Sequence, residues 1–445
     1  MTHDPLRDAL LTARVPRYTS YPPADRFAPD VGSAEKDAWI RAVPAGSQVS
    51  LYVHVPFCRR LCWFCACRTQ GTRSDAPLDR FLDHLAIEIE ATRARLPADV
   101  VISALHLGGG TPTLLSPERI DRLGAMLRGA FPIDDATEVS VEIDPCEFDE
   151  SRRDALMRMG LSRASIGVQD FDPLVQAAIG RDQSAEQTAG AVEGLRAAGV
   201  GSVNFDLLYG LPHQTEARLA RTIDTVLSLG PDRLALYGYA HVPWVARRQK
   251  LIPEAALPSP EERLALADLA RARLIGAGYV AVGIDHFARP DDSLARAARE
   301  GGLRRNFQGY TTDTTPVLLG MGPSAISRFP QGYVQNAPAS DAWQKAVTEG
   351  QIPATRGIAM TPETTAISTV IERLMCYGEV DLAAVDPSRT DAFLATAQAA
   401  LEQYPSAGML EGHVLRLSSF AAARLVAQVF DRGGDGSARR YSQAC

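Results

Sequence analysis

Four cysteines within ten residues constrain this chain more than any other feature of its sequence. They form the run Cys58-Arg-Arg-Leu-Cys62-Trp-Phe-Cys65-Ala-Cys67, which follows the alternating apolar segment Leu51-Tyr-Val-His-Val-Pro-Phe57. Zinc sites usually draw ligands from two separated pairs, and a ferredoxin-type run supplies four thiolates, so a C-x3-C-x2-C triplet fits neither pattern well. Three thiolates on a four-iron cluster would leave one iron open. Free cysteines in a loop and a small zinc knuckle are the alternatives.

The rest of the chain predicts a parallel sheet covered by helices. From about residue 49 onward, short strand-like runs alternate with amphipathic helical stretches, and repeated strand-then-helix units are typical of α/β folds. About six such units indicate an open or partial (β/α)6 barrel rather than an eight-stranded one. The expected strands are 50–55, 103–107, 138–143, 163–168, 202–207 and 233–238.

The two faces of these expected strands differ in character. In the fifth strand, Val203, Phe205 and Leu207 share one face, and Asn204 and Asp206 lie on the other. The apolar face must pack on the helices, so the polar face points into the barrel. An ordinary barrel interior is filled with branched apolar side chains, so this one is better interpreted as a wet, ligand-binding cavity. An antiparallel sandwich with a wetted polar face is the alternative.

The length of 445 residues accommodates a barrel of roughly 250 residues and a second unit. We expect an N-terminal arm over 1–48, the barrel domain with its extension over 49–330, and a smaller, mostly helical, winged-helix-like C-terminal domain over 331–445. The net charge of -7 disfavours a dedicated nucleic-acid binder. We therefore expect the C-terminal domain to be a lid or a substrate-docking unit.

The sequence also bears on the cellular compartment. No charged start followed by an apolar stretch is found at the N-terminus, and no run approaches the roughly 18 apolar residues that span a bilayer. Outside the cysteine run, Cys146, Cys376 and Cys445 are scattered, a pattern of a metal site in a reducing compartment rather than of a disulfide framework. We expect a cytoplasmic protein without a membrane span, and no special role for these three cysteines.

The cysteine run resembles that of the radical S-adenosylmethionine (SAM) superfamily. Together with Tyr52-Val-His-Val-Pro-Phe57 and the additional Cys67, it is similar to the run of the oxygen-independent coproporphyrinogen III oxidase (coproporphyrinogen dehydrogenase) family. Arg17-Tyr-Thr-Ser-Tyr-Pro-Pro23 also matches, which implies an arm lying near the active site. Other matching segments are 239–243, 285–292, 305–312 and 319–327, whereas Trp63, Ala66 and Arg68 replace the more usual Tyr, Gly and Asn.

This resemblance implies a radical SAM barrel with a 4Fe–4S cluster ligated by Cys58, Cys62 and Cys65, and with SAM, expected as two molecules, as the second cofactor. The implied reaction is the oxidative decarboxylation of two propionate side chains of coproporphyrinogen III to vinyl groups, giving protoporphyrinogen IX. An electron passed from the cluster to SAM would start the reaction by generating a 5'-deoxyadenosyl radical. Cys67 is implied as a catalytic thiol near the second SAM rather than as a cluster ligand.

Polar residues at the ends of the expected strands are candidate ligand contacts. Glu142, Gln169 and Asp206 face inward, and a buried carboxylate requires a cation or hydroxyls, which SAM offers. A structural salt bridge is the alternative for each carboxylate. The run Gly108-Gly-Gly-Thr-Pro-Thr113 allows close backbone approach to a ligand, or is merely a tight turn. The resemblance assigns SAM contacts to Tyr52, Phe64, Gly109, Gly110, Thr111, Glu142, Gln169, Arg181, Asp206, Ala240 and Ile326.

The expected partners are coproporphyrinogen III and an unidentified electron donor and acceptor, with no nucleic acid, and we expect a monomer. Because the substrate carries several propionates, Arg17, Arg304 and Arg305 are candidates for binding its carboxylates. His241 and His286 are open between a substrate role and a structural one. A haem-binding chaperone with the same cysteine triplet and a radical SAM enzyme for another tetrapyrrole are the alternatives. The fourth cysteine and the N-terminal arm favour the oxidase over the chaperone.

Overall fold

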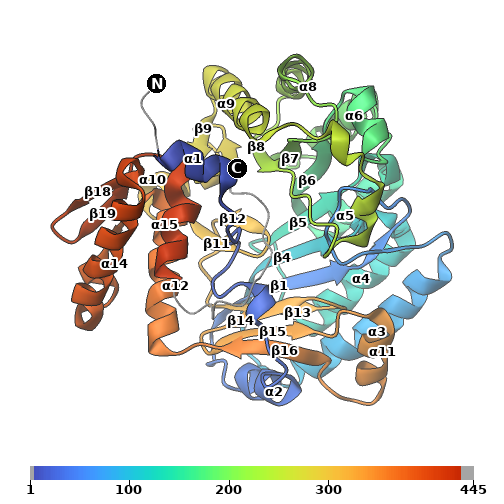
Figure 1. Ribbon diagram of the computed structural model, residues 1–445. Coiled ribbons are helices and arrows are strands. Elements are labelled where there is room, and N and C mark those ends of the chain that lie inside the picture. Colours follow the sequence, from blue (N-terminus) through green and yellow to red (C-terminus); the bar gives the residue numbers. More distant parts are fainter. Residues whose placement is uncertain (1–4, 432–445) are drawn as a thin grey trace.

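A twelve-stranded sheet forms the centre of the molecule (Figure 1), as seen in a computed structural model that describes residues 5–431. All six expected strands are present and pair in chain order as parallel neighbours. They are β1 (Gln48–Val55), β4 (Val101–Gly109), β5 (Glu138–Ile143), β6 (Leu161–Gln169), β7 (Ser202–Tyr209) and β8 (Arg233–Gly238). This pairing confirms the α/β partial-barrel prediction and excludes the antiparallel sandwich.

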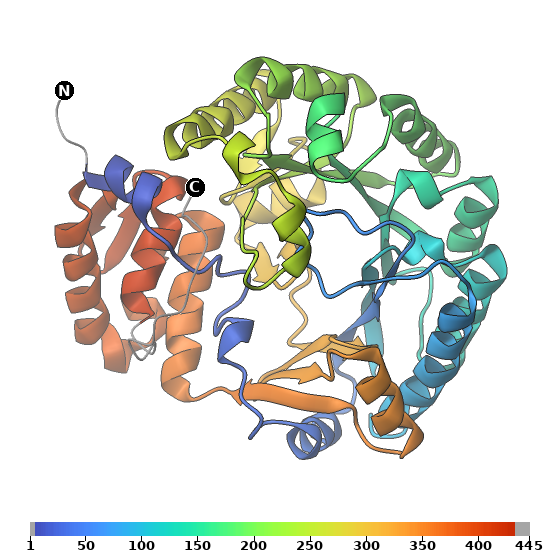
Figure 2. The ribbon, with the colours of Figure 1, turned by 45° about the vertical axis from the view of Figure 1, so that its right-hand side comes forward.

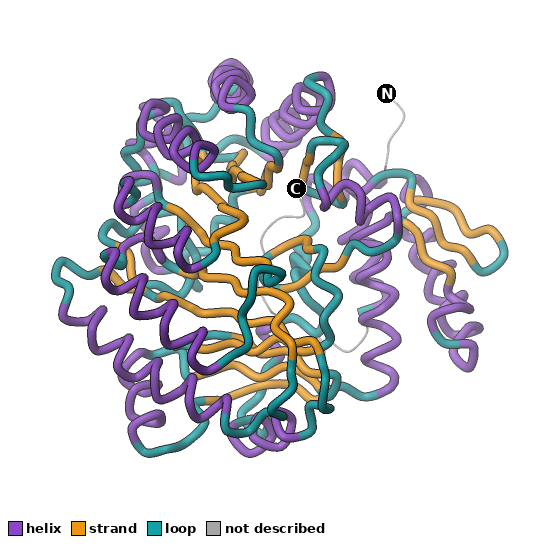
Figure 3. Tube along the Cα trace, turned by 180° about the vertical axis from the view of Figure 1, so that it is seen from behind, coloured by secondary structure: helices purple, strands orange, loops and turns teal. Residues whose placement is uncertain are grey.

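Helices cover the outer face of these strands, as Figures 2 and 3 show from two sides. Helix α8 begins after Thr215, whose side chain caps the first turn, and ends at Gly230 in the left-handed region. Its buried stripe of Leu219, Ile223 and Val226 faces the sheet. The helices between or after the strands, α8 included, are α3 (Ala76–Arg93), α4 (Pro117–Ala130), α5 (Glu150–Met159), α6 (Pro173–Ala178), α7 (Ala185–Ala197), α8 (Glu216–Leu229) and α9 (Pro260–Gly276).

The predicted division of the strand faces is confirmed. Val203, Phe205 and Leu207 are fully buried in the core between sheet and helices, and each such side chain stabilises the fold by about 1.5–3 kcal/mol. Asn204 and Asp206, on the opposite face, are only partly buried. The barrel interior is therefore lined by polar groups rather than plugged by aliphatic ones.

The sheet extends beyond the six expected strands on both sides. β13 (Val317–Met321) pairs with the free edge of β1 in parallel, and β10 (His286–Ala288) pairs with β8 in antiparallel orientation. These strands are only five and three residues long, too short for a clear alternation of apolar and polar side chains, so the sequence did not predict them. The remaining edge strands are β9 (Val280–Val282), β14 (Ile326–Phe329), β15 (Gly332–Asn336) and β16 (Ala354–Ala359), and β11 (Arg304–Asn306) and β12 (Gly309–Thr311) form a separate hairpin.

A second hydrophobic core lies in the C-terminal part of the chain. It contains Val370, Leu374 and Val426, and the first helix of the chain adds Leu6 and Leu10 to it. Its elements are α12 (Pro362–Tyr377), α13 (Leu382–Val385), α14 (Thr390–Gln403), α15 (Ala423–Phe430) and a three-stranded sheet of β17 (Glu379–Asp381), β18 (Gly408–Glu411) and β19 (Val414–Leu417). Because the main sheet continues to β16, we propose that this domain begins near residue 360 rather than at 331.

The N-terminal arm connects the two cores. It contains α1 (Pro5–Thr12) and α2 (Ser33–Arg41), and α10 (Ser293–Glu300) and α11 (Ser340–Thr348) complete the α-helices of the described residues. No helix between residues 5 and 431 is long and apolar enough to cross a membrane. Cys445 and the glycine-rich tail lie outside the described residues.

A buried charged network holds the closing edge of the barrel. Glu88 on α3 accepts hydrogen bonds from the Gly322 amide at 2.8 Å, the Trp343 indole at 2.9 Å and the Asn336 amide at 2.7 Å. Lys36 on α2 donates to Asn336 Oδ1 at 2.8 Å. Burial raises the pKa of Glu88 and lowers that of Lys36, so each charge depends on the other and on these donors.

We expect Glu88→Ala to lower the free energy of unfolding by about 3–5 kcal/mol, because it leaves Lys36 buried without its counter-charge. The matched control is Glu349→Ala, which breaks an exposed ion pair with Lys345 at 3.9 Å and should change stability by less than about 0.5 kcal/mol. Urea unfolding followed by tryptophan fluorescence measures both. Similar small losses in the two variants would contradict a structural role for this network.

Candidate active site

The candidate site lies at the carboxyl ends of the parallel strands. The cysteine loop follows β1, the glycine run ends β4, and Glu142, Gln169 and Asp206 lie on β5, β6 and β7. In barrel enzymes this end carries the chemistry, because the loops that follow the strands converge there. The structure therefore brings the main sequence-predicted residues to one end of one barrel.

The cysteine loop is fastened at its base and at its tip. β2 (Phe57–Cys58) and β3 (Gln70–Gly71) pair across its base, and the Trp63 amide donates to Ile179 O at 2.8 Å. The Trp63 indole lies against Gly180 so closely that a Cβ there would come within 2.7 Å of the ring. The departure from tyrosine at residue 63 is thus accommodated by a glycine on the facing loop.

The thiols of this loop have different surroundings. Burial raises the pKa of Cys58 to about 11 and also raises that of Cys62. Hydrogen bonds from Cys67 lower the pKa of Cys65, and the same contact raises that of Cys67. Cys62 Sγ accepts from Arg181 Nη1 at 3.6 Å, and Cys65 Sγ accepts from the Cys67 amide at 3.4 Å. Donors to the sulfurs are what a thiolate-bound cluster uses to tune its charge.

The three thiols of the cysteine loop could bind either a zinc ion or a four-iron cluster. Over residues 5–431, no three His, Cys, Asp or Glu side chains converge as ligands of a single ion would. A four-iron cube binds its thiolates at separate corners and does not require that convergence. Cys58, Cys62 and Cys65, which are free and partly buried on one loop, fit the cube.

The glycine run makes a close backbone approach between β4 and β1. The Gly110 and Thr111 amides donate to Val55 O at 2.7 Å and Phe57 O at 2.8 Å, and a Cβ on Gly110 would lie 2.5 Å from Phe57 O. These amides are therefore used within the protein. An ammonium group needs acceptors, so the run offers a ligand its carbonyl oxygens rather than the amides.

Glu142 is held by groups that the sequence analysis did not assign. Its carboxylate accepts from the Gly109 amide at 3.0 Å and lies 3.4 Å from His106 Nε2. His106 Nδ1 contacts Ser140 Oγ at 2.6 Å, and its ring stacks on Tyr52 with centroids 5.8 Å apart. Burial opposes ionisation of Glu142, but the contact with His106 and the Gly109 amide keeps its pKa below the ordinary value. The register of β4 and β5 places His106 opposite Ser140, which brings its ring within reach of Glu142.

Asp206 on β7 is the second carboxylate on the polar face of the sheet. Its oxygens accept from Ser165 Oγ at 3.0 Å and Asn204 Nδ2 at 2.9 Å. Burial and the nearby Glu142 charge raise the pKa of Asp206 to about 6. Two neutral partners do not compensate a buried charge, so Asp206 is suited to a cationic or hydroxyl-bearing ligand.

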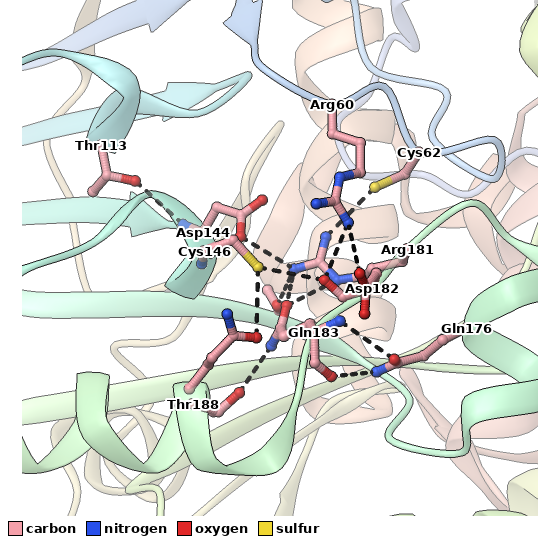
Figure 4. Close-up of polar contacts among 12 residues, drawn as sticks. Arg60, Cys62, Thr113, Asp144, Cys146, Gln176, Arg181, Asp182, Gln183 and Thr188 are labelled. Carbon is pink, nitrogen blue, oxygen red and sulfur yellow. Dashed lines mark hydrogen bonds and ion pairs between the residues drawn. The ribbon is translucent and has the colours of Figure 1, made fainter.

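Arg181 faces the cysteine loop (Figure 4). It donates to Gly167 O at 2.5 Å and, through Nε, to Gln183 Oε1 at 2.9 Å. Gln169, at the end of β6, adopts a left-handed backbone with φ 68°, which is uncommon for a non-glycine residue and is typical of functional sites. The side chain of Cys146 lies in the same corner, 3.5 Å from Asp182 O.

The other predicted contacts are placed around the lumen mouth. Phe64 lies in the cysteine loop, Ala240 follows β8, and Ile326 begins β14. Gln249 links two of them, because its Nε2 donates to Phe64 O at 2.7 Å and to Ala240 O at 3.0 Å. A cavity of about 370 Å³ lies beside the loop. It is lined by Pro56, by Cys65 to Gln70, by Val245, Ala246 and Arg248, and by Pro338 to Asp341.

A cationic group from the arm and the β11–β12 hairpin lies across the lumen. Arg17 Nη2 donates to Gly238 O at 2.6 Å, and Arg305 Nε donates to Tyr18 O at 2.9 Å. The Arg305 guanidinium stacks over Tyr310 at 4.4 Å, and its buried Nη1 has no hydrogen-bond partner among the described residues. A buried donor without a partner is costly, so Arg305 can accept an anionic ligand.

The two histidines left open by the sequence have protein partners. His241 lies 2.9 Å from the Tyr239 hydroxyl and 2.8 Å from Glu254, and His286 Nδ1 lies 2.8 Å from Asp285. His286 and Arg305, with a smaller effect from Arg424, lower the pKa of Asp285 strongly against the effect of burial. These contacts favour structural roles for both histidines.

Comparisons with known proteins show what the chain as a whole is similar to. Residues 52–226 match the model of the radical SAM superfamily. The chain is 54% identical over 374 residues to the oxygen-independent coproporphyrinogen III oxidase of Paracoccus denitrificans, covering 84% of this chain and 83% of that protein. It is 49% identical over 441 residues to the enzyme of the same name from Cereibacter sphaeroides, covering 98% and 97%. The structure of coproporphyrinogen III oxidase (HemN) from Escherichia coli, described as a radical SAM enzyme, superposes with a TM-score of 0.89 at 38% identity over 94% of this chain and 98% of that one.

We expect Asp206→Asn to stabilise the ligand-free protein at about pH 7. The native pKa of about 6 lies above the ordinary 3.8, so between these values the native state binds more protons than the unfolded state, and the free energy of unfolding falls as the pH rises. Asparagine removes that loss, which we put at about 1–2 kcal/mol because the carboxyl is only partly shielded from water.

Urea unfolding at about pH 7 and about pH 4 tests this expectation, since the gain should vanish at the lower pH. Asp182→Asn, at a side chain that is 94% exposed, is the control and should alter neither value. A stability loss for Asp206→Asn at neutral pH would show that Asp206 is compensated by stronger partners than Ser165 and Asn204.

Proposed function

The chain belongs to the oxygen-independent coproporphyrinogen III oxidase family of the radical SAM superfamily, and on this premise we propose which of its residues carry the reaction. The reaction is the oxidative decarboxylation of two propionate side chains of coproporphyrinogen III to vinyl groups, which gives protoporphyrinogen IX for haem. This conclusion is supported by 49% sequence identity over 98% of the chain to an enzyme of that name, together with a cysteine triplet beside a polar lumen.

The enzyme works with a 4Fe–4S cluster and SAM. When bound, these two supply the chemistry that removes a hydrogen atom from the propionate carbon next to the ring. Cys58, Cys62 and Cys65 would hold the cluster, with Arg181 near the sulfur of Cys62. Three thiolates would leave one iron of the cluster open for SAM. Cys67, whose amide donates to Cys65 Sγ, would lie beside a second SAM.

The SAM contacts are assigned by matching charge to charge. Glu142 and Asp206 offer carboxylates to the ammonium and hydroxyl groups of SAM, and Arg181 offers a fork of donors to its carboxylate. The carbonyl oxygens of the glycine run accept from the methionyl ammonium. The full set comprises Tyr52, Phe64, Gly109, Gly110, Thr111, Glu142, Gln169, Arg181, Asp206, Ala240 and Ile326.

The arm and the hairpin would bind the substrate propionates. Arg305 has a free buried donor, and Arg17 lies beside the same part of the lumen. Arg304 is already engaged by Glu372 at 3.4 Å, so it contributes less. A carboxylate bound to a buried guanidinium is held in one orientation, which places the neighbouring carbon for hydrogen removal.

The other partners and the compartment extend the same proposal. An electron donor reduces the cluster, and an acceptor takes the electron left when carbon dioxide departs; the protein acts as a monomer. The cysteines of the described residues are free, which suits the reducing cytoplasm where thiolate clusters persist.

Removal of any one of Cys58, Cys62 and Cys65 by mutation to Ala is expected to remove most of the iron and acid-labile sulfide from anaerobically purified protein, because a cube held by two thiolates is weakly bound. Vinyl product in an anaerobic assay with reductant and SAM should disappear with the metal. Cys146→Ala is the matched control: its thiol is exposed in the same corner as Cys62, and both the iron content and turnover should stay at wild-type values.

Cys67→Ala should separate the two roles of the loop, retaining iron and sulfide but losing turnover. Zinc in place of iron in the wild-type protein would contradict the cluster assignment. Tight uptake of haem without vinyl product would instead indicate a haem-binding chaperone.

Arg305→Met is expected to raise the KM for coproporphyrinogen III by about tenfold with a smaller change in kcat, because it removes a charge-assisted contact made before and during the reaction. Arg17→Met should act in the same direction. Arg304→Met is the matched comparison and should have the smallest effect, since Glu372 already neutralises that side chain. Steady-state kinetics at saturating SAM measure all three, and unchanged KM values in every variant would reject propionate binding here.

A further inference from the structure

An exposed apolar and basic surface lies next to the cysteine loop. It comprises Trp244, Val245, Arg247, Lys250 and Leu251, and we refer to it as the 244–251 surface. Trp244, Val245 and Leu251 are 45%, 58% and 58% exposed, among the most exposed large apolar side chains of the described residues. Arg247 and Lys250 are also exposed, on the short 3-10 helix Arg247–Leu251. Exposed aromatic and aliphatic side chains flanked by cations are typical of a docking site for another molecule.

Hydrogen bonds connect this surface directly to the cysteine loop. Arg248 Nη2 donates to Cys67 O at 3.2 Å and to Thr69 Oγ1 at 2.8 Å. Gln249 Nε2 donates to Phe64 O at 2.7 Å. Figure 2 shows the yellow-green segment after β8 beside the blue cysteine loop. A molecule bound to the 244–251 surface would therefore lie next to the cysteine loop.

The charge of this surface is opposite to that of the whole chain. The sequence carries 46 basic and 53 acidic residues, with a net charge of -7. Residues 244–251, Trp-Val-Ala-Arg-Arg-Gln-Lys-Leu, carry three basic side chains and no acidic one. A local positive field on an acidic protein attracts a negatively charged partner and orients it during encounter.

We propose that the 244–251 surface docks a small acidic electron-carrier protein that reduces the cluster. This proposal rests on the proposed function, because the cluster must receive its electron from outside the chain. In the transfer the carrier is oxidised by one electron and the cluster is reduced by one, and no covalent bond changes at the surface. Trp244 and Leu251 supply the apolar centre of the contact, and Arg247 and Lys250 supply its charged rim.

The substrate and an anionic membrane are the competing occupants. The propionates of coproporphyrinogen III would also favour cations, but the buried donor of Arg305 already suits them. Exposed Trp and Lys side chains would also suit a membrane surface. The 3-10 helix Arg247–Leu251 has only five residues, however, which is too short for an amphipathic membrane-binding helix. Proximity to the cysteine loop favours the carrier, and the experiment separates the three.

The test uses the double variant Arg247→Glu/Lys250→Glu and a reduced plant-type ferredoxin as the acidic carrier. The Kd of the oxidised ferredoxin, measured by titration calorimetry with the holoenzyme, should rise by about tenfold or more at low ionic strength, and the difference should shrink at high salt. The KM for reduced ferredoxin should rise in parallel. Turnover with dithionite, which needs no docking surface, should stay at the wild-type value.

Two further variants define the result. Arg7→Glu/Arg80→Glu makes the same change of charge at two exposed side chains elsewhere, and it should leave the Kd near the wild-type value. Trp244→Ser keeps the charge and should weaken binding without altering its salt dependence. It also keeps the proposal testable if the charge-reversed double variant fails to fold.

Several outcomes would overturn the proposal. An unchanged Kd for ferredoxin in both surface variants rejects the surface as its docking site. A raised KM for coproporphyrinogen III with either reductant assigns the surface to the substrate. Binding to phosphatidylglycerol vesicles that the double variant loses, with ferredoxin affinity intact, assigns it to a membrane. Wild-type protein that gives no vinyl product with dithionite contradicts the proposed function itself, and the Kd measurement still decides the docking question.

Discussion

The requirement that buried polar groups have partners governs this barrel. Its lumen contains carboxylates, imidazoles and hydroxyls where most barrels have packed aliphatic side chains. Glu142 meets the requirement through the Gly109 amide and His106, whereas Asp206 has only Ser165 and Asn204. The contrast explains their opposite pKa shifts. The protein itself stabilises Glu142 as an anion. Asp206 becomes a stable anion only beside a ligand that supplies positive charge or hydroxyls.

An incomplete barrel also has to be closed by something other than strands of the same kind. On one side, β13 extends the parallel sheet past β1, and the Glu88 network joins it to α2, α3 and α11. On the other, short antiparallel strands continue from β8, and the arm contacts the end of β8 through Arg17, which donates to Gly238 O. The arm and the β11–β12 hairpin meet through Arg305, which donates to Tyr18 O.

Periodicity predicted the six central strands because each carries a long alternation of apolar and polar residues between two helices. It could not find β9 to β16, which are three to six residues long and therefore too short to show a clear period. The same difference between long strands and irregular segments applies to the residues of the candidate site. Residues on long strands, such as Glu142 and Asp206, were placed correctly, but His106 acquired its role only through its register opposite Ser140. Gln249 could have been flagged only by the unusual run of cations around it.

The cysteine loop shows why residues whose role depends on tertiary contacts, such as Gln249, matter. Three sides of the barrel hold it: Arg181 contacts Cys62 from the loop between α6 and α7, Gln249 holds Phe64 from the segment after β8, and His54 on β1 contacts Arg68 O at 3.0 Å. A loop held only at its base would let each thiol sample several positions, and binding a cluster would then cost ordering entropy. With these contacts the thiols are positioned by the barrel itself. The polar lumen and the cysteine loop are therefore structurally coupled, because His54, which contacts the loop, is also hydrogen-bonded to Tyr52 inside the lumen at 2.9 Å.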